Sequence, residues 1–144
     1  MTWGEIQIIS LQKMFAKDVP ITMEDLEDLR NDDDTKLYLS QMNATANEAI
    51  QRIKPYVQNT YEYDEDEKEY VKKTTDVIDT DTTDTTELSY PLEACVLIPL
   101  YIASQLYKDD DISIATQYRN EFETGLQNLV LNIENQAKVE EVYY

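Results

Sequence analysis

The sequence predicts an all-α protein, a small helical bundle built around one central apolar helical hairpin. Two segments, over about 35–54 and 112–137, place apolar residues at intervals of three and four, the pattern of a helix with one buried face. A third, over about 91–108, is apolar nearly all round, as expected of a helix at the centre of a core. A chain of 144 residues can bury one such core. We therefore expect one helical domain over 1–138 and an extended C-terminal arm over 139–144.

Two shorter helices are expected before residue 35. Thr2 opens a T-x-x-E motif, the spacing of a capping box, so a first helix should run over about 3–15. Its apolar residues cover much of its circumference, which indicates packing on more than one side. Pro20 then breaks the chain, and Thr22 can cap a short second helix over 23–30.

The helix over 35–54 has a clear amphipathic pattern. The acidic run 32–34 precedes it, where negative charge favours the positive end of a helix dipole. Pro55 marks its end, because the residue before a proline disfavours helical geometry. Its buried face is expected to consist of Leu39, Met42, Ala46, Ala49, Ile50 and Ile53.

The segment over 58–90 has a different character. Residues 61–70 read YEYDEDEKEY, and 74–86 mix Thr and Asp around only two apolar residues, Val77 and Ile78. This composition buries too little apolar surface to offset the entropy of ordering, although its Thr, Tyr and Val content suits an exposed hairpin. We expect either an acidic loop that becomes ordered on binding or a weak β-hairpin.

The apolar segment from Pro91 to about Lys108 is expected to form the centre of the fold. Pro99 lies inside it and removes one helical hydrogen bond, so we expect a kink there that packing must compensate. The acidic run 109–111 then forms a short turn, and the last helix, over about 112–137, should return antiparallel to the first. Its buried face is expected to be Ala115, Tyr118, Phe122, Leu126, Leu129, Ile133 and Ala137, with Arg119, Asn120, Glu121 and Glu123 facing outward.

The chain ends in VEEVYY over 139–144, which we expect to lie outside the last helix. Terminal residues commonly fray, and fraying alone is one interpretation of this tail. In the other, two valines and two tyrosines leave apolar area that a groove or sheet edge of a partner can bury. The tail would then be a docking arm.

The residue types that most enzymes need are scarce. The chain has no histidine and only two glycines, which disfavours Ser-His-Asp catalysis, most zinc sites and glycine-rich phosphate loops. Its acidic clusters could attract Ca²⁺ or Mg²⁺ but lack the spacing and glycine of an EF-hand, so we interpret them as helix caps and solvated turns. The single cysteine, Cys95, lies in the most apolar segment and is expected in the core. We predict no enzymatic activity, no cofactor and no metal site.

The charge balance restricts the partners. Thirty acidic residues against 12 basic ones give a formal net charge of −18, which repels phosphate backbones and anionic lipid headgroups. Sequence-specific binding to DNA is therefore not expected. The N-terminus lacks the pattern of a signal peptide, and no apolar run approaches the roughly 20 residues of a membrane span, so we expect a soluble chain made inside the cell.

The segment from Leu97 to Glu123 reads LIPLYIASQLYKDDDISIATQYRNEFE. With its proline-bearing apolar helix, acidic turn and following helix that carries YRNEFE, it resembles phage head-tail connector (adaptor) proteins of the tailed siphophage type. The similarity is weaker over the first two helices, and the acidic middle is short where longer relatives carry a β-rich insertion. The ring-body positions that the resemblance implies are Pro99, Tyr101, Asp109, Asp110, Asp111, Tyr118, Arg119 and Phe122.

The resemblance implies a structural virion protein that forms a ring, commonly of twelve subunits, in the phage neck. Its partners would be the portal protein and a further neck or tail-completion protein, and DNA would pass through without sequence-specific binding. It would be assembled in the host cytoplasm. If acidic side chains line the lumen, they would keep DNA from adhering to the wall. The portal-docking arm, placed by position alone, would be Val139, Glu140, Glu141, Val142, Tyr143 and Tyr144.

A second hypothesis comes from the charge alone. A strongly acidic helical protein can act as a regulator or nucleic-acid mimic that covers a basic protein surface. Such a chain would stay monomeric and bind a nuclease or a repressor. Assembly into a ring on the portal separates the two hypotheses.

Overall fold

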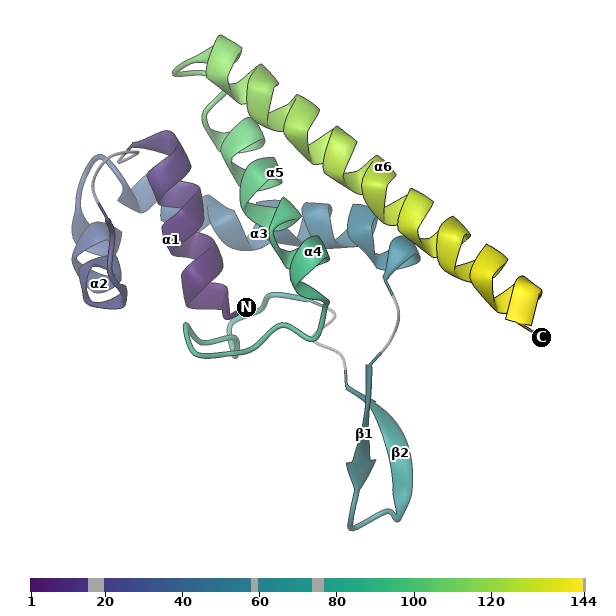
Figure 1. The fold of residues 1–144 in the computed structure, drawn as a ribbon. Helices are drawn as coiled ribbons and strands as arrows, with labels where there is room; N and C mark the ends of the chain where they lie inside the picture. The colour runs from purple at the N-terminus through teal and green to yellow at the C-terminus, as the bar shows by residue number, and fades with distance from the viewer. Residues whose placement is uncertain (16–19, 58–59, 74–76, 144) are drawn as a thin grey trace.

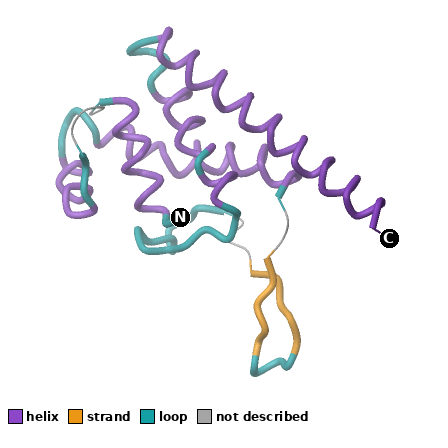
Figure 2. The backbone as a smooth tube through the Cα atoms, viewed as in Figure 1, coloured by secondary structure: helices purple, strands orange, loops and turns teal. Residues whose placement is uncertain are grey.

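The computed structural model is a helical body from which a two-stranded hairpin and one end of the longest helix project (Figures 1 and 2). The all-α expectation is confirmed. The structure describes residues 1–15, 20–57, 60–73 and 77–143, and the side chains of these apart from 60–62, 71–73 and 132–143. The elements are α1 (Trp3–Met14), α2 (Met23–Asn31), α3 (Lys36–Ile53), the 3-10 turn η1 (Lys54–Tyr56), β1 (Thr60–Asp64), β2 (Glu69–Lys73), α4 (Leu92–Cys95), α5 (Leu97–Leu106) and α6 (Ile112–Tyr143).

The first three helices begin and end close to where the sequence places them. The Thr2 hydroxyl accepts a hydrogen bond from the backbone N–H of Glu5 at 3.2 Å and so caps α1. Thr22 forms a reciprocal capping box with Asp25 at the start of α2. In α3 all six residues of the expected stripe are buried, so the predicted inner face is confirmed.

The central apolar segment is broken at Val96 rather than kinked at Pro99. The nitrogen of Pro99 carries no hydrogen for the Cys95 carbonyl, and a proline ring clashes with the carbonyl four residues earlier. Because α4 ends at Cys95 and α5 begins at Leu97, Pro99 falls in the first turn of α5, where its N–H would have no helical partner. The expected cost of an interior proline is thereby avoided.

The hairpin of α5 and α6 is antiparallel, as expected, and packs across α3 (Figure 1). The described part of the expected α6 stripe, from Ala115 to Leu129, is buried. Ile133 and Ala137 lie outside the described side chains. Of the residues expected to face outward, Glu123 is only half-exposed, because its carboxylate binds Arg52.

The expectation of an extended arm separate from the last helix is wrong for residues 139–143, because α6 continues to Tyr143. The sequence from 132 to 143 contains neither glycine nor proline, and six of its twelve residues are Glu, Gln, Ala or Lys, all good helix formers. Nothing in it ends the helix. The arm is thus the end of α6, with Tyr144 beyond the described residues.

Of the two alternatives for 58–90, the structure contains the hairpin over its first half. Strands β1 and β2 are antiparallel, with Tyr63 opposite Tyr70, and residues 65–68 form the turn. Lys68 closes this turn with a φ of 54°, in the left-handed region. The hairpin points away from the helices (Figure 2).

The second half, 77–90, is a loop fixed to the body, contrary to the expectation that its composition could not hold it in place. Ile78 and Leu88 are buried in the core. The side-chain amide of Asn47 donates to the Ile78 carbonyl at 2.9 Å and accepts from its N–H at 2.7 Å. Specific hydrogen bonds and two buried side chains thus order a segment that has few apolar residues.

The same loop covers the start of α1. The backbone N–H groups of Trp3 and Gly4, which have no partner within the helix, donate to the carbonyls of Thr86 and Asp84, both at 2.9 Å. A Cβ atom at position 4 would lie 2.8 Å from the Asp84 carbonyl oxygen. Glycine is therefore required there by the close approach of two backbones.

Candidate interaction surfaces

Four of the expected ring-body residues form internal contacts of the subunit. Pro99, Tyr118 and Phe122 are buried, and Tyr101 is half-buried. The Tyr101 and Phe122 rings meet edge to face with centroids 5.1 Å apart. The Tyr118 hydroxyl donates to the Lys13 carbonyl at 2.9 Å and so joins α6 to the end of α1. These side chains hold the helices of one chain together.

The acidic turn between α5 and α6 is built by its own side chains. The Asp111 carboxylate accepts from the N–H groups of Ser113 at 3.1 Å and Ile114 at 3.2 Å, which caps α6. Asp110 accepts a hydrogen bond from the Tyr38 hydroxyl, and this bond is the main cause that raises the pKa of Tyr38 to about 12. The interpretation as cap and turn is confirmed for Asp110 and Asp111.

The described residues contain no group of three or more acidic or cysteine side chains placed to hold a metal ion. Cys95 is buried, and burial raises the pKa of its thiol to about 11, so the nucleophilic thiolate is disfavoured at neutral pH. Within the same described part of the chain, none of the helices is both long and apolar enough to span a bilayer.

Two ion pairs between side chains far apart in the chain were not foreseen from the sequence. Arg52 on α3 binds Glu123 on α6 through two hydrogen bonds, at 2.5 and 2.9 Å, and its guanidinium lies 5.2 Å from the centroid of the Phe122 ring. Arg30 on α2 binds Asp84 in the loop at 2.5 Å. Each pair joins segments more than 50 residues apart, so no local spacing in the sequence indicates it.

Asp84 lies at the centre of a small polar cluster. Its carboxylate also accepts from the side-chain amide of buried Gln7 at 2.9 Å. The hydrogen bond from Arg30, aided by the one from Gln7, lowers the pKa of Asp84 below its ordinary value. The cluster therefore ties the loop to α1 and α2 while Asp84 is ionised.

The variant Asp84→Asn is expected to lose stability in a pH-dependent way. Because the pKa of Asp84 is lower in the folded than in the unfolded chain, its ionisation favours folding at neutral pH, and this contribution disappears as the pH falls through the folded-state pKa. We expect a loss of about 1–2 kcal/mol in the free energy of unfolding at pH 7, because both side chains are partly exposed.

Urea unfolding between pH 7 and pH 3 measures this difference. The deficit of Asp84→Asn relative to the native chain should shrink as the pH falls below the ordinary pKa of an aspartate. The control is Asp28→Asn at an exposed site on α2, where we expect a change under about 0.5 kcal/mol at every pH. A deficit that is independent of pH would contradict the assigned role of the Asp84 charge.

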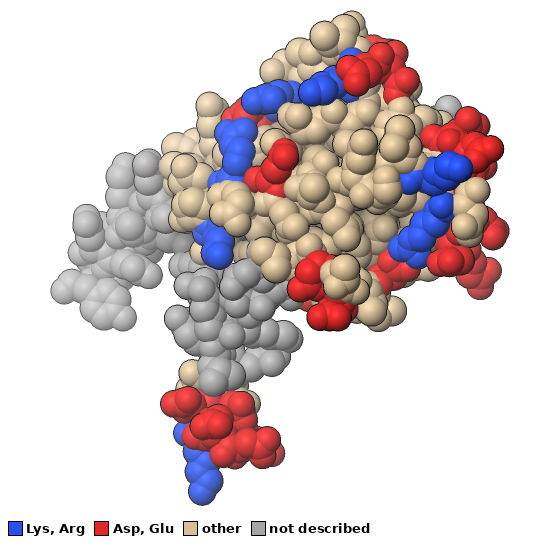
Figure 3. All heavy atoms as spheres, turned by 180° about the vertical axis from the view of Figure 1, so that it is seen from behind, with Lys and Arg blue, Asp and Glu red and all other residues tan. Residues whose placement is uncertain are grey.

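Three features of the described surface remain available for partners. The hairpin tip projects below the body and is mostly acidic, and at the opposite end of the body Lys or Arg side chains lie beside Asp or Glu side chains (Figure 3). A groove of about 320 Å³ runs between α5 and α6 near that end. Finally, one exposed face of α6 is polar with a single charged side chain; it consists of Ser113, Thr116, Gln117, Asn120, Glu121, Thr124, Gly125 and Asn128.

Comparison of the chain with protein-family models, with curated proteins and with solved structures found no match. The assignment of a function therefore depends on the surfaces described above and on the resemblance seen in the sequence.

Proposed function

We propose that this chain is a structural subunit of the phage neck, a head-tail adaptor that forms a ring between the portal and the tail. In this proposal the helical body supplies contacts between subunits, the end of α6 docks on the portal above, and a neck or tail-completion protein binds below. DNA passes through the ring without sequence-specific contacts.

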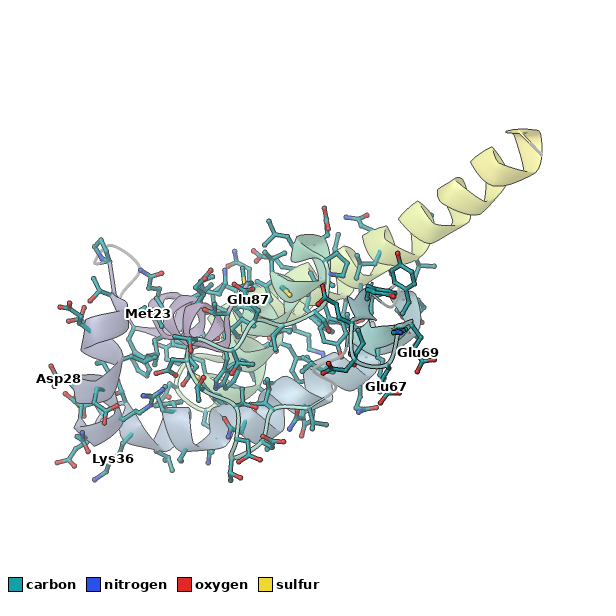
Figure 4. All side chains as sticks on the ribbon, turned by 90° about the horizontal axis from the view of Figure 1, so that it is seen from below. Met23, Asp28, Lys36, Glu67, Glu69 and Glu87 are labelled. Carbon is teal, nitrogen blue, oxygen red and sulfur yellow. The ribbon has the colours of Figure 1, made fainter. Side chains whose placement is uncertain are left out.

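The projecting end of α6 carries the proposal. The helix has 32 residues, so it is about 48 Å long at 1.5 Å per residue. Its last turns extend beyond the rest of the chain in two perpendicular views (Figures 1 and 4). A helical segment gains most of its stability from packing, so one that leaves the body is well suited to bind a partner.

Further support comes from the nature of the exposed surface. The polar face of α6 has few charges, which suits packing against a neighbouring subunit in a chain whose net charge is −18. Like charges at such a contact would repel. The rest of the chain is acidic, which suits a ring through which DNA passes, because negative charge disfavours adhesion of DNA to the wall.

Reconstitution with the portal tests the proposal. The purified chain is mixed with the portal oligomer encoded in the same genome, and the complex is sized by mass photometry and imaged by negative-stain electron microscopy. We expect several copies to add to each portal as a ring. A chain that stays monomeric beside the portal and binds a nuclease or a repressor would instead support the acidic mimic.

The order of the neighbouring genes gives an independent check. Portal and capsid genes upstream with tail genes downstream are expected for an adaptor. A gene beside a nuclease or a repressor operon would count against the proposal.

A further inference from the structure

The tip of the β-hairpin is acidic and aromatic, and it points away from the helices (Figure 2). Over residues 63–70 it carries five carboxylates and one ammonium group, that of Lys68. The rings of Tyr63 and Tyr70 meet edge to face with centroids 5.3 Å apart, and their side chains are 53% and 73% exposed. A lone two-stranded hairpin is only marginally stable in water. The tip therefore has both the charge and the apolar area of a contact surface.

The groove between α5 and α6 has the complementary character. Lys108 and Arg119 line it, both are exposed, and neither forms an ion pair among the described residues. The one carboxylate in its lining, that of Glu123, is engaged by Arg52. Ile112, which is 71% exposed, adds apolar surface. In a chain of net charge −18, this groove is a local basic site with an apolar neighbour.

The neighbouring acidic turn lies outside the walls of the groove. Asp109, Asp110 and Asp111 are absent from the lining of the groove. The Asp111 carboxylate is held by the N-terminus of α6, and that of Asp110 by the Tyr38 hydroxyl. The walls themselves thus carry two cationic groups and one carboxylate, and the acidic turn lies beside them.

The tip and the groove of one chain cannot meet each other. The hairpin projects from one end of the molecule, and the turn that joins α5 to α6 lies at the opposite end (Figure 1). We infer that the hairpin tip of one copy binds in the α5–α6 groove of the next copy, with the carboxylates on Lys108 and Arg119 and the tyrosine pair against Ile112.

This contact is head to tail, so it leaves a free tip and a free groove on every pair. Repetition of such a contact produces a closed ring when the rotation between copies allows it. The inference deepens the proposed function and depends on it for the ring. The contact is small, because only a hairpin tip enters the groove, and its charges are exposed to solvent. We therefore expect weak association that falls as salt is added.

Cross-linking of two isotopically distinct forms of the chain detects the contact directly. Equal amounts of ¹⁴N- and ¹⁵N-labelled protein are mixed at low ionic strength and treated with a carbodiimide, which joins an amine to a nearby carboxylate. We expect a peptide pair of mixed label that links Lys108 to a carboxylate of residues 64–69. Links between copies that avoid the hairpin, or the absence of any such link, would overturn the inference.

Charge reversal gives a sharper test. The first variant, Glu65→Lys with Glu67→Lys, has a basic tip and an intact groove. The second, Lys108→Glu with Arg119→Glu, has an acidic tip and an acidic groove. All four side chains are exposed, and circular dichroism checks that each variant folds. In sedimentation velocity at low salt, each variant alone should associate at least about tenfold more weakly than the native chain.

Mixing the two variants should restore association, because every tip then finds a groove of opposite charge on the other variant. A single chain that carries all four substitutions should also associate, because it has a basic tip and an acidic groove. The control is Asp28→Lys with Asp81→Lys, which changes the net charge at exposed sites by the same amount as the first variant does. Asp28 lies far from the hairpin residues Glu67 and Glu69 (Figure 4). Loss of association in this control variant, or no recovery of association in the mixture, would contradict a specific contact between tip and groove.

The portal experiment separates this inference from the proposed function. If both reversed variants still form rings on the portal, the proposed adaptor function is supported and the inferred hairpin contact is wrong. If the native chain forms no ring but cross-links tip to groove in solution, the contact stands and the portal assignment is wrong.

Discussion

Deletion of residues 132–144 is expected to abolish assembly on the portal while the thermal unfolding midpoint of the body stays within about 5 °C of that of the full chain. The described core contacts of α6 lie between Ala115 and Leu129, before the deleted part. The last turns of the helix project from the body (Figure 4). Their removal therefore takes away the surface proposed for the portal and leaves the described core contacts in place.

A shorter deletion, of residues 139–144 alone, serves as the matched comparison. It removes the six residues that the sequence suggests as the arm and keeps the helix to residue 138. Loss of portal binding in both deletions, measured by mass photometry, would place the contact in the last six residues. Retention of portal binding by the shorter deletion alone would place the contact in residues 132–138. Normal assembly of the longer deletion would contradict a docking role for this end of α6.

The parts of the fold that follow local rules were predictable. Thr2 and Thr22 cap helices because a hydroxyl acceptor near an exposed N–H is favourable whatever the rest of the chain does. The buried stripes of α3 and α6 follow from a period of 3.6 residues. Such signals lie within one element, so a single sequence suffices to find them.

Two predictions, the kink at Pro99 and the separate C-terminal arm, were wrong because a local rule was applied to the wrong residues. The effect of Pro99 falls on the carbonyl four residues earlier, so the break appears at Val96 and not at the proline. The apolar pairs in VEEVYY suggested a separate arm, although no glycine or proline separates them from α6. In both cases the relevant signal was present in the sequence.

The fixed loop and the ion pairs could not be predicted. Asn47 meets Ile78 across 31 positions, and Arg30 meets Asp84 across 54. Nothing in the local sequence distinguishes Asp84 from the other carboxylates of this acidic chain. The groove between α5 and α6 could not be predicted either, because Lys108 and Arg119 come together only when α5 and α6 pack.

Among single substitutions in the core, Phe122→Ala is expected to be the most damaging. The Phe122 side chain is 1% exposed and heads the largest fully buried side chains of the described core. Its ring contacts Tyr101 on α5 and lies beneath the guanidinium of Arg52 on α3, so its removal leaves a cavity where three helices meet. We expect a loss of about 3–5 kcal/mol in the free energy of unfolding.

That loss is a large share of the roughly 5–15 kcal/mol by which such domains are stable. Urea unfolding monitored by circular dichroism measures it. The only other phenylalanine, Phe15, provides the matched control, because it is 44% exposed and its ring contacts Tyr38 and Tyr107 near the surface. For Phe15→Ala, where little cavity forms, we expect a loss of about 1 kcal/mol. Equal losses in the two variants would mean that the junction of α3, α5 and α6 is not the core that holds the helical body together.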